Sequence, residues 1–111
     1  MSEQEQDDRQ NRVEHTPDAV IITLLEPLTF KRSKMDDEET LEALTLPRQV
    51  KGKHLKAMDQ ADGEIGKSMA LLAKLARVPV HVLDELDSRD FELAMEAMEP
   101  FLPERRKTGT R

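Results

Sequence analysis

Several residue types are missing or scarce in this chain of 111 residues, and each absence excludes something. There is no Cys, which excludes disulfides and thiolate chemistry and is compatible with a reducing cytosol. Trp and Tyr are absent and Phe occurs three times, so the core must consist of Leu, Ile, Val, Met and Ala. No apolar run approaches the ~20 residues that span a bilayer, and no signal peptide is recognisable. We expect a soluble, intracellular protein with no membrane partner.

The charge of the chain is negative and unevenly distributed. The net charge is -6 at pH 7. Residues 1–18 carry six acids and two Arg, whereas residues 104–111 carry one acid and four bases. An acidic protein repels phosphate backbones at long range, and the basic C-terminal segment is too short to reverse this. We therefore expect no nucleic-acid partner.

A chain of this length has room for one domain with a modest core. Residues 1–18 contain almost no apolar side chains to offset the entropy of ordering, so we expect a disordered acidic tail. Residues 19–102 are predicted to form a single domain, and residues 103–111 a basic, flexible C-terminus. A core this small would gain from association with other protein.

Two strands are predicted in the first half of the domain. Val20 to Leu25 is β-branched at its start and is followed by Pro27, after which residues 28–30 extend or return the strand. Its apolar side chains lie on both faces, so it is covered on both sides or docks against a partner. Residues 41–46 favour a second strand, stopped by Pro47, over a short helix covering 38–46. The two strands form a β-hairpin with a long acidic turn at residues 31–40.

Helices are predicted in the second half. Residues 49–60 are weakly amphipathic, residues 64–77 form a strong helix that Pro79 ends, and residues 82–86 form a short turn of helix. The last helix starts at an N-cap provided by Asp87 or Ser88 and stops or kinks near Pro100. The fold class is therefore α+β, with a small N-terminal β-hairpin followed by a bundle of three to four short helices. We expect one apolar stripe to pack against the other: Ile65, Met69, Leu72 and Leu75 against Phe91, Met95 and Met98.

One string, Ala61 to Ser68, resembles a phosphate-binding loop if Ala replaces the first Gly. Such a loop needs a buried strand before it, so that backbone N–H groups point at the phosphates. The preceding segment is polar and helical, and Asp62 and Glu64 would place negative charges in the cradle. We interpret the string as a helix start, with Glu64 near the N-terminal end of the dipole.

No arrangement of residues indicates catalysis, a cofactor or a metal. His15, His54 and His81 are far apart and lack partners at metal-ligand spacing. The run Asp36 to Glu39 lacks the alternating ligands and central Gly of a calcium loop and is interpreted as a solvated turn. We predict no catalytic residues, no cofactor-binding residues and no metal ligands, and hence a protein that is not an enzyme.

The chain resembles the phage tail assembly chaperones, the family that includes proteins E, 41 and 14 of contractile-tailed bacteriophages. The resemblance covers about residues 19–102, although the acidic segment at 31–40 replaces the short Gly-containing turn that members often have. It is carried by the segments Val20–Leu25, Leu44–Arg48, Val50–Ala57, Met69–Ala76, Val78–Pro79, Leu83–Leu86 and Asp90–Phe91.

The resemblance implies a non-enzymatic factor, made by a phage or prophage in the host bacterial cytoplasm, that binds the tape measure protein. It would keep this long helical protein soluble until tail tube subunits polymerise around it, and it would be absent from the mature virion. Apolar helix faces suit that role because they bind amphipathic segments. Self-association is a further possible use of apolar area on the hairpin.

Protein-binding residues are expected among the apolar side chains of the hairpin and the methionines, which serve both cores and adaptable surfaces. The candidates are Val20, Ile22, Leu24, Leu44, Leu46, Met58, Met95 and Met98. Two other functions remain open: a small structural tail or connector protein of the virion, and a transcriptional regulator using residues 50–77 as a helix-turn-helix. The second requires a basic recognition face, against which the acidic balance argues.

Overall fold

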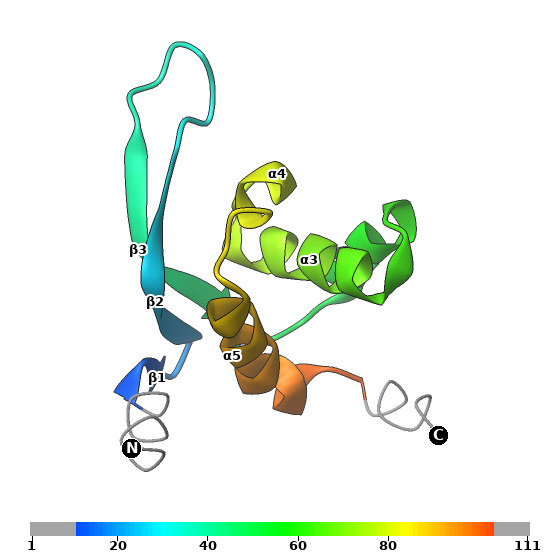
Figure 1. Ribbon diagram of the computed structural model, residues 1–111. Helices are drawn as coiled ribbons and strands as arrows, with labels where there is room; N and C mark the ends of the chain where they lie inside the picture. Colours follow the sequence, from blue (N-terminus) through cyan, green and yellow to red (C-terminus); the bar gives the residue numbers. More distant parts are fainter. Residues whose placement is uncertain (1–10, 104–111) are drawn as a thin grey trace.

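The computed structural model describes residues 11–103, which form a three-stranded antiparallel sheet followed by short helices (Figure 1). The strands are β1 (Val13–His15), β2 (Ala19–Phe30) and β3 (Glu39–Pro47). The α-helices are α2 (Gly52–Leu55), α3 (Gly63–Ala76), α4 (Val80–Leu83) and α5 (Ser88–Met98), and two 3-10 helices are η1 (Lys56–Gln60) and η2 (Glu99–Phe101). The predicted α+β class, with strands first and helices after them, is confirmed.

The sheet contains a strand that the sequence did not predict. β1 pairs antiparallel with β2, with Val13 opposite Ile22. The chain reverses between them in a turn where the N–H of Thr16 donates to the carbonyl of Ala19 over 2.8 Å and the N–H of Ala19 donates to the Thr16 hydroxyl over 2.9 Å. Residues 13–15, expected in a disordered tail, therefore belong to the fold, because β2 satisfies their backbone groups. The first ten and last eight residues, which hold most of both predicted tails, lie outside the described residues.

β2 and β3 form the predicted hairpin, and the strand at 41–46 is confirmed over the helical alternative. The turn between them, residues 31–38, lies at the far end of the hairpin and extends beyond the helices (Figure 1). The inner face of the sheet is fully covered, whereas the outer face is open: Ile21 is half-buried and Leu25 is 40% exposed. Of the two arrangements predicted for the first strand, the structure shows one covered face and one open face. The inner face consists of Val20, Ile22, Leu24, Leu28, Phe30, Leu44 and Leu46.

β2 continues through Pro27 because the hairpin contains a bulge. Pairing is regular up to Thr23 and resumes at Leu28, so residues 24–27 of β2 lie opposite residue 42 of β3. Proline has no N–H to donate to a ladder and is therefore tolerated at such an irregularity. The sequence left open whether residues 28–30 extend the strand or return, and the structure shows that they extend it.

Asp90 of α5 supplies hydrogen bonds that the bulge lacks. Its side chain is fully buried and accepts the N–H of Leu25 at 2.9 Å and the N–H of Glu26 at 3.3 Å. Its Oδ1 also accepts a hydrogen bond of 2.6 Å from the guanidinium of Arg12. A buried carboxylate is stable only when it is paired in this way. Asp90 thus connects the N-terminal end of the described chain, the bulge and α5.

The ends of the two long helices agree with the sequence signals. α3 ends before Arg77, which adopts the left-handed conformation at φ 61° and donates its N–H to the carbonyl of Ala73, and Pro79 follows. Asp87 is the N-cap of α5, since its side chain accepts the N–H of Arg89 at 2.8 Å. Pro100 lies in the 3-10 turn after α5.

The short helices differ in detail from the prediction. The segment predicted as one helix at 49–60 is divided into α2 and η1, and the short helix predicted at 82–86 covers Val80–Leu83 instead. Both differences concern elements of four or five residues, whose boundaries depend on packing more than on the local sequence.

Both long helices pack on the inner face of the sheet, α5 against β2 and α3 against β3. Leu72, Leu75 and Met98 are buried in one common core, as the predicted pairing of stripes requires. The prediction is wrong for Ile65, which is 64% exposed because the first turn of α3 extends past the core. The sheet, and not a helical hairpin alone, therefore completes the core.

Candidate functional site

Most of the predicted protein-binding residues are core residues. Of the eight candidates, seven are buried in the monomer, and Met95 is half-buried. Burying a large aliphatic side chain stabilises a fold by roughly 1.5–3 kcal/mol, so these side chains are required by the domain itself. They do not form a surface that a partner can reach without unfolding. The buried seven are Val20, Ile22, Leu24, Leu44, Leu46, Met58 and Met98.

Among the described residues, four large apolar side chains are exposed instead. Met35 is 93% exposed in the hairpin turn, and Leu25 lies on the outer face of the sheet. Ile65 is in the first turn of α3, and Val80, 50% exposed, begins α4. Single exposed apolar residues are normal on a protein surface. Leu25 and Met35 share the hairpin, where half-buried Ile21 adds apolar area to the outer face.

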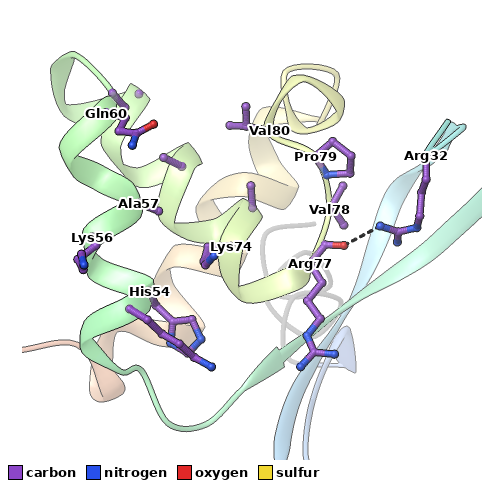
Figure 2. Close-up of a pocket in the computed structure, with 15 residues that line it drawn as sticks. Arg32, His54, Lys56, Ala57, Gln60, Lys74, Arg77, Val78, Pro79 and Val80 are labelled. Carbon is purple, nitrogen blue, oxygen red and sulfur yellow. Dashed lines mark hydrogen bonds between the residues drawn. The ribbon is translucent and has the colours of Figure 1, made fainter.

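A cleft of about 1000 Å³ lies among the short helices beside the hairpin, and we call it the basic cleft. It is bounded by α2, η1, α3 and the segment that leads into α4, and Arg32 reaches it from the hairpin (Figure 2). Its long polar side chains are all basic apart from Gln60, and within residues 11–103 no acidic side chain lines it. The basic residues are Arg32, Lys53, His54, Lys56, Lys74 and Arg77.

Small side chains line the rest of the basic cleft. They come from η1, from the segment after it and from one face of α3, while the apolar residues at one end begin α4. In Figure 2, Gln60 and Val80 lie at one end, and His54 and Arg77 at the other. The small residues are Ala57, Ala61, Gly66, Ala70 and Ala73, and the apolar residues are Val78, Pro79 and Val80.

Three residues hold Arg32 in place, and one of them is Phe30, whose ring centroid lies 5.2 Å from the guanidinium. The Nε of Arg32 donates to Oε1 of Glu39 at 2.9 Å, and its Nη1 donates to the carbonyl of Arg77 at 3.0 Å (Figure 2). The second bond satisfies a carbonyl at the end of α3, where such groups lack helical partners. Glu39 offsets the charge of Arg32, so the remaining lysines and Arg77 provide most of the positive field.

The pKa of His54 is sensitive to the positive charge of the basic cleft. Its Nδ1 accepts the N–H of Lys51 at 2.9 Å, a bond that closes the start of α2 and requires an unprotonated nitrogen. Burial is the main cause that lowers the pKa of His54 below 6.5, followed by repulsion from nearby cations. These cations are Lys53, Lys51, Lys74 and Arg77.

The positive surface continues beside the basic cleft. A neighbouring hollow between the sheet and α3 shares Lys53, His54, Lys74 and Arg77 with it and adds Arg48 and Lys51. Asp18 is the acidic residue in the lining of this second hollow. Arg48 is held over the ring of Phe101 at 5.3 Å and donates to the carbonyl of Thr16 at 3.0 Å.

The sequence did not predict the basic cleft. Its cations are separated by 45 residues, from Arg32 to Arg77, and the negative net charge of the chain hides them. Two local signals point to it: Lys53 and Lys56 are three residues apart, and Lys74 in the last turn of α3 is followed three residues later by Arg77, the C-cap.

Other predicted features have the following positions. Gly63, at φ +78°, starts α3, and a 3-10 helix rather than a buried strand precedes it, so the string at 61–68 lacks the geometry of a phosphate loop. The histidines are on β1, α2 and α4, and no group of three or more potential metal ligands occurs within residues 11–103. In the same range, no helix is both long enough and apolar enough to span a bilayer.

The fold and surface define a small α+β protein with a charged cleft and an open sheet face. A family model described as phage tail assembly chaperone proteins, E, or 41 or 14, matches residues 22–103, which is 82 of 111 residues. The chain therefore belongs to the phage tail assembly chaperone family. Comparisons with curated proteins and with solved structures gave no significant match.

Proposed function

We propose that this protein binds the tape measure protein of its phage and keeps it soluble in the host bacterial cytoplasm during tail assembly. The observation that carries the proposal is the family match, which extends over the hairpin, the basic cleft and both long helices. Membership indicates a role in tail assembly and phage proteins as partners. The tape measure protein is the partner that the family resemblance favours.

The open side of the hairpin is the surface we assign to this client. Leu25 is exposed there, and Ile21 lies on the same face of β2, while Met35 is exposed in the turn at the end of the hairpin. An amphipathic client segment needs apolar contacts of this kind, and the buried methionines cannot supply them. The acidic residues of the hairpin turn, Asp36 to Glu38, would keep the complex soluble.

Co-expression with the adjacent tape measure gene tests the proposal. We expect the tape measure protein to move into the soluble fraction and to co-purify with this chain. The double substitution Leu25→Asp and Met35→Asp should reduce co-purification, whereas Ile65→Asp, an exposed apolar residue on α3, should not. Unchanged solubility without a complex would contradict the proposal.

The alternative function, a structural tail or connector protein, makes a different prediction. A structural component remains in the purified mature particle, whereas an assembly chaperone is removed before completion. Mass spectrometry of purified virions separates the two, and detection of this chain at stoichiometric amounts would favour the structural function.

A further inference from the structure

The basic cleft concentrates positive charge in an acidic protein. The chain has a net charge of -6, yet the cleft gathers five permanent cations and His54 without an acidic lining residue. Like charges held close together repel one another, which disfavours the arrangement unless a partner neutralises it. Glu39 neutralises Arg32, but Lys53, Lys56 and Lys74 are exposed and line the same cleft. Charge complementarity therefore favours a ligand with several carboxylates or phosphates.

The small side chains of the cleft allow close approach of a partner backbone. Ala57 of η1, Ala70 of α3 and Ala61 between these two helices have short side chains, and Gly66 has none. A Cβ placed on Gly66 would meet only the Cβ of Ala61, at 3.8 Å, so packing within this chain does not require glycine there. Small residues let two helices approach within the lower part of the 8–10 Å range of helix packing.

The lining favours a protein over a nucleic acid. Single strands bind to large aromatic side chains on which bases stack, and among the described residues no Phe, Tyr or Trp lines the basic cleft. Duplex DNA is read by an element that projects into a groove, whereas this surface is concave. Apolar Val80, half exposed at the rim, offers a contact that an amphipathic peptide uses and a phosphate backbone does not.

We propose that the basic cleft binds an acidic amphipathic α-helix of a partner protein. Lys53, Lys56 and Lys74 pair with carboxylates on one side of that helix, and its apolar stripe packs over the small residues and against Val80. This inference goes beyond the proposed function, because it concerns a charged surface on the helices and not the apolar hairpin face. It holds for any partner that carries such a helix.

A designed peptide tests the inference with the full chain. The probe is a fluorescent helical peptide of about 20 residues with Leu on one face and Glu on the other. In the matched control peptide, Gln replaces every Glu. We expect the Glu peptide to bind, by fluorescence anisotropy, at least about tenfold more tightly than the Gln peptide, and to bind less tightly as salt is raised.

Two charge-reversal variants locate the binding site. Lys53→Glu with Lys74→Glu should abolish binding, whereas Lys34→Glu with Lys67→Glu, which changes the net charge equally outside the cleft, should retain it. Circular dichroism checks that both variants fold. Bound carboxylates should also raise the pKa of His54, measured by NMR titration, because they oppose the cations that lower it.

Three outcomes would overturn the inference. They are equal binding of the Glu and Gln peptides, equal loss in the two charge-reversal variants, and tighter binding of a short DNA duplex than of the Glu peptide. Because the tape measure protein takes no part in these measurements, failure of the proposed function leaves their interpretation unchanged.

Discussion

Charged side chains occur in two contrasting settings in this protein. At the bulge of β2, buried Asp90 is paired with Arg12 and with two backbone N–H groups. In the basic cleft, exposed lysines face solvent, and none of the described residues in the lining is acidic. In the first arrangement the charges are paired within the chain, whereas the exposed lysines of the second can pair with the carboxylates of a ligand. The comparison separates charges that hold the fold from charges that are available for binding.

Removing the buried carboxylate should have the largest effect. Asp90→Ala leaves Arg12 and the N–H groups of Leu25 and Glu26 without their acceptor, and breaking a buried pair costs about 3–5 kcal/mol. Urea denaturation measures the free energy of unfolding. Asp84→Ala, at an exposed acid on the surface, is the control and should change it by less than about 0.5 kcal/mol. A small effect of Asp90→Ala would show that Asp90 is not essential to the bulge.

A substitution in the core should have the next largest effect. It tests whether apolar side chains, like the charged ones, separate into a buried group that stabilises the fold and an exposed group that does not. Leu72 on α3 is fully buried, so Leu72→Ala should lower the free energy of unfolding by about 2–5 kcal/mol. Ile65→Ala, on the same helix but 64% exposed, should change it by less than about 0.5 kcal/mol. Similar losses in both variants would contradict the placement of Ile65 outside the core.

In the cleft, a substitution should change electrostatics more than stability. Lys53→Ala removes one of the cations that lower the pKa of His54, so that pKa should rise, as followed by NMR titration of the imidazole. Lys67→Ala, on α3 and away from the basic cleft, is the control and should leave the pKa of His54 unchanged. A fall in the pKa of His54 after Lys53→Ala would contradict the conclusion that nearby cations lower it.

The smallest effect is a pH dependence at His54. Its pKa in the folded state lies below its ordinary value of 6.5, so below pH 6.5 the unfolded chain binds more protons at this group. The free energy of unfolding should therefore decrease as pH falls through 6.5, and this contribution should vanish in His54→Gln. Thermal melts of both proteins at matched pH values measure the difference. A steeper loss in His54→Gln than in the unmodified chain would contradict the sign.

Much of the fold follows from local patterns in the sequence. The hairpin, the end of α3 at Arg77 and the N-cap at Asp87 were predicted because each depends on residues close together in the chain. β1 was missed because Val13–His15 is polar and short, and its pairing partner in β2 lies several residues further on. The role of Asp90 was missed because its hydrogen-bond partners are 64 to 78 residues away in the sequence.

The candidate site was less predictable than the fold. Apolar residues such as Ile22 and Met98 satisfy the pattern for a core and for a binding surface alike, and the pattern does not show which face is covered. The basic cleft depends on a contact between distant segments: Arg32 of the hairpin turn donates a hydrogen bond to the carbonyl of Arg77 at the end of α3. Net charge averages over the whole chain and therefore hides such a local cluster.

The ion pair between Arg12 and Asp90 also has a consequence for synthesis on the ribosome. The bulge in β2 is completed by a residue translated 64 to 65 positions after the amides it accepts. Until Asp90 emerges, the bulge has exposed N–H groups and α5 does not yet cover β2. Contacts this distant in sequence form late. Final folding therefore awaits α5, and a nascent chain stalled before residue 90 should be open to proteolysis within the sheet.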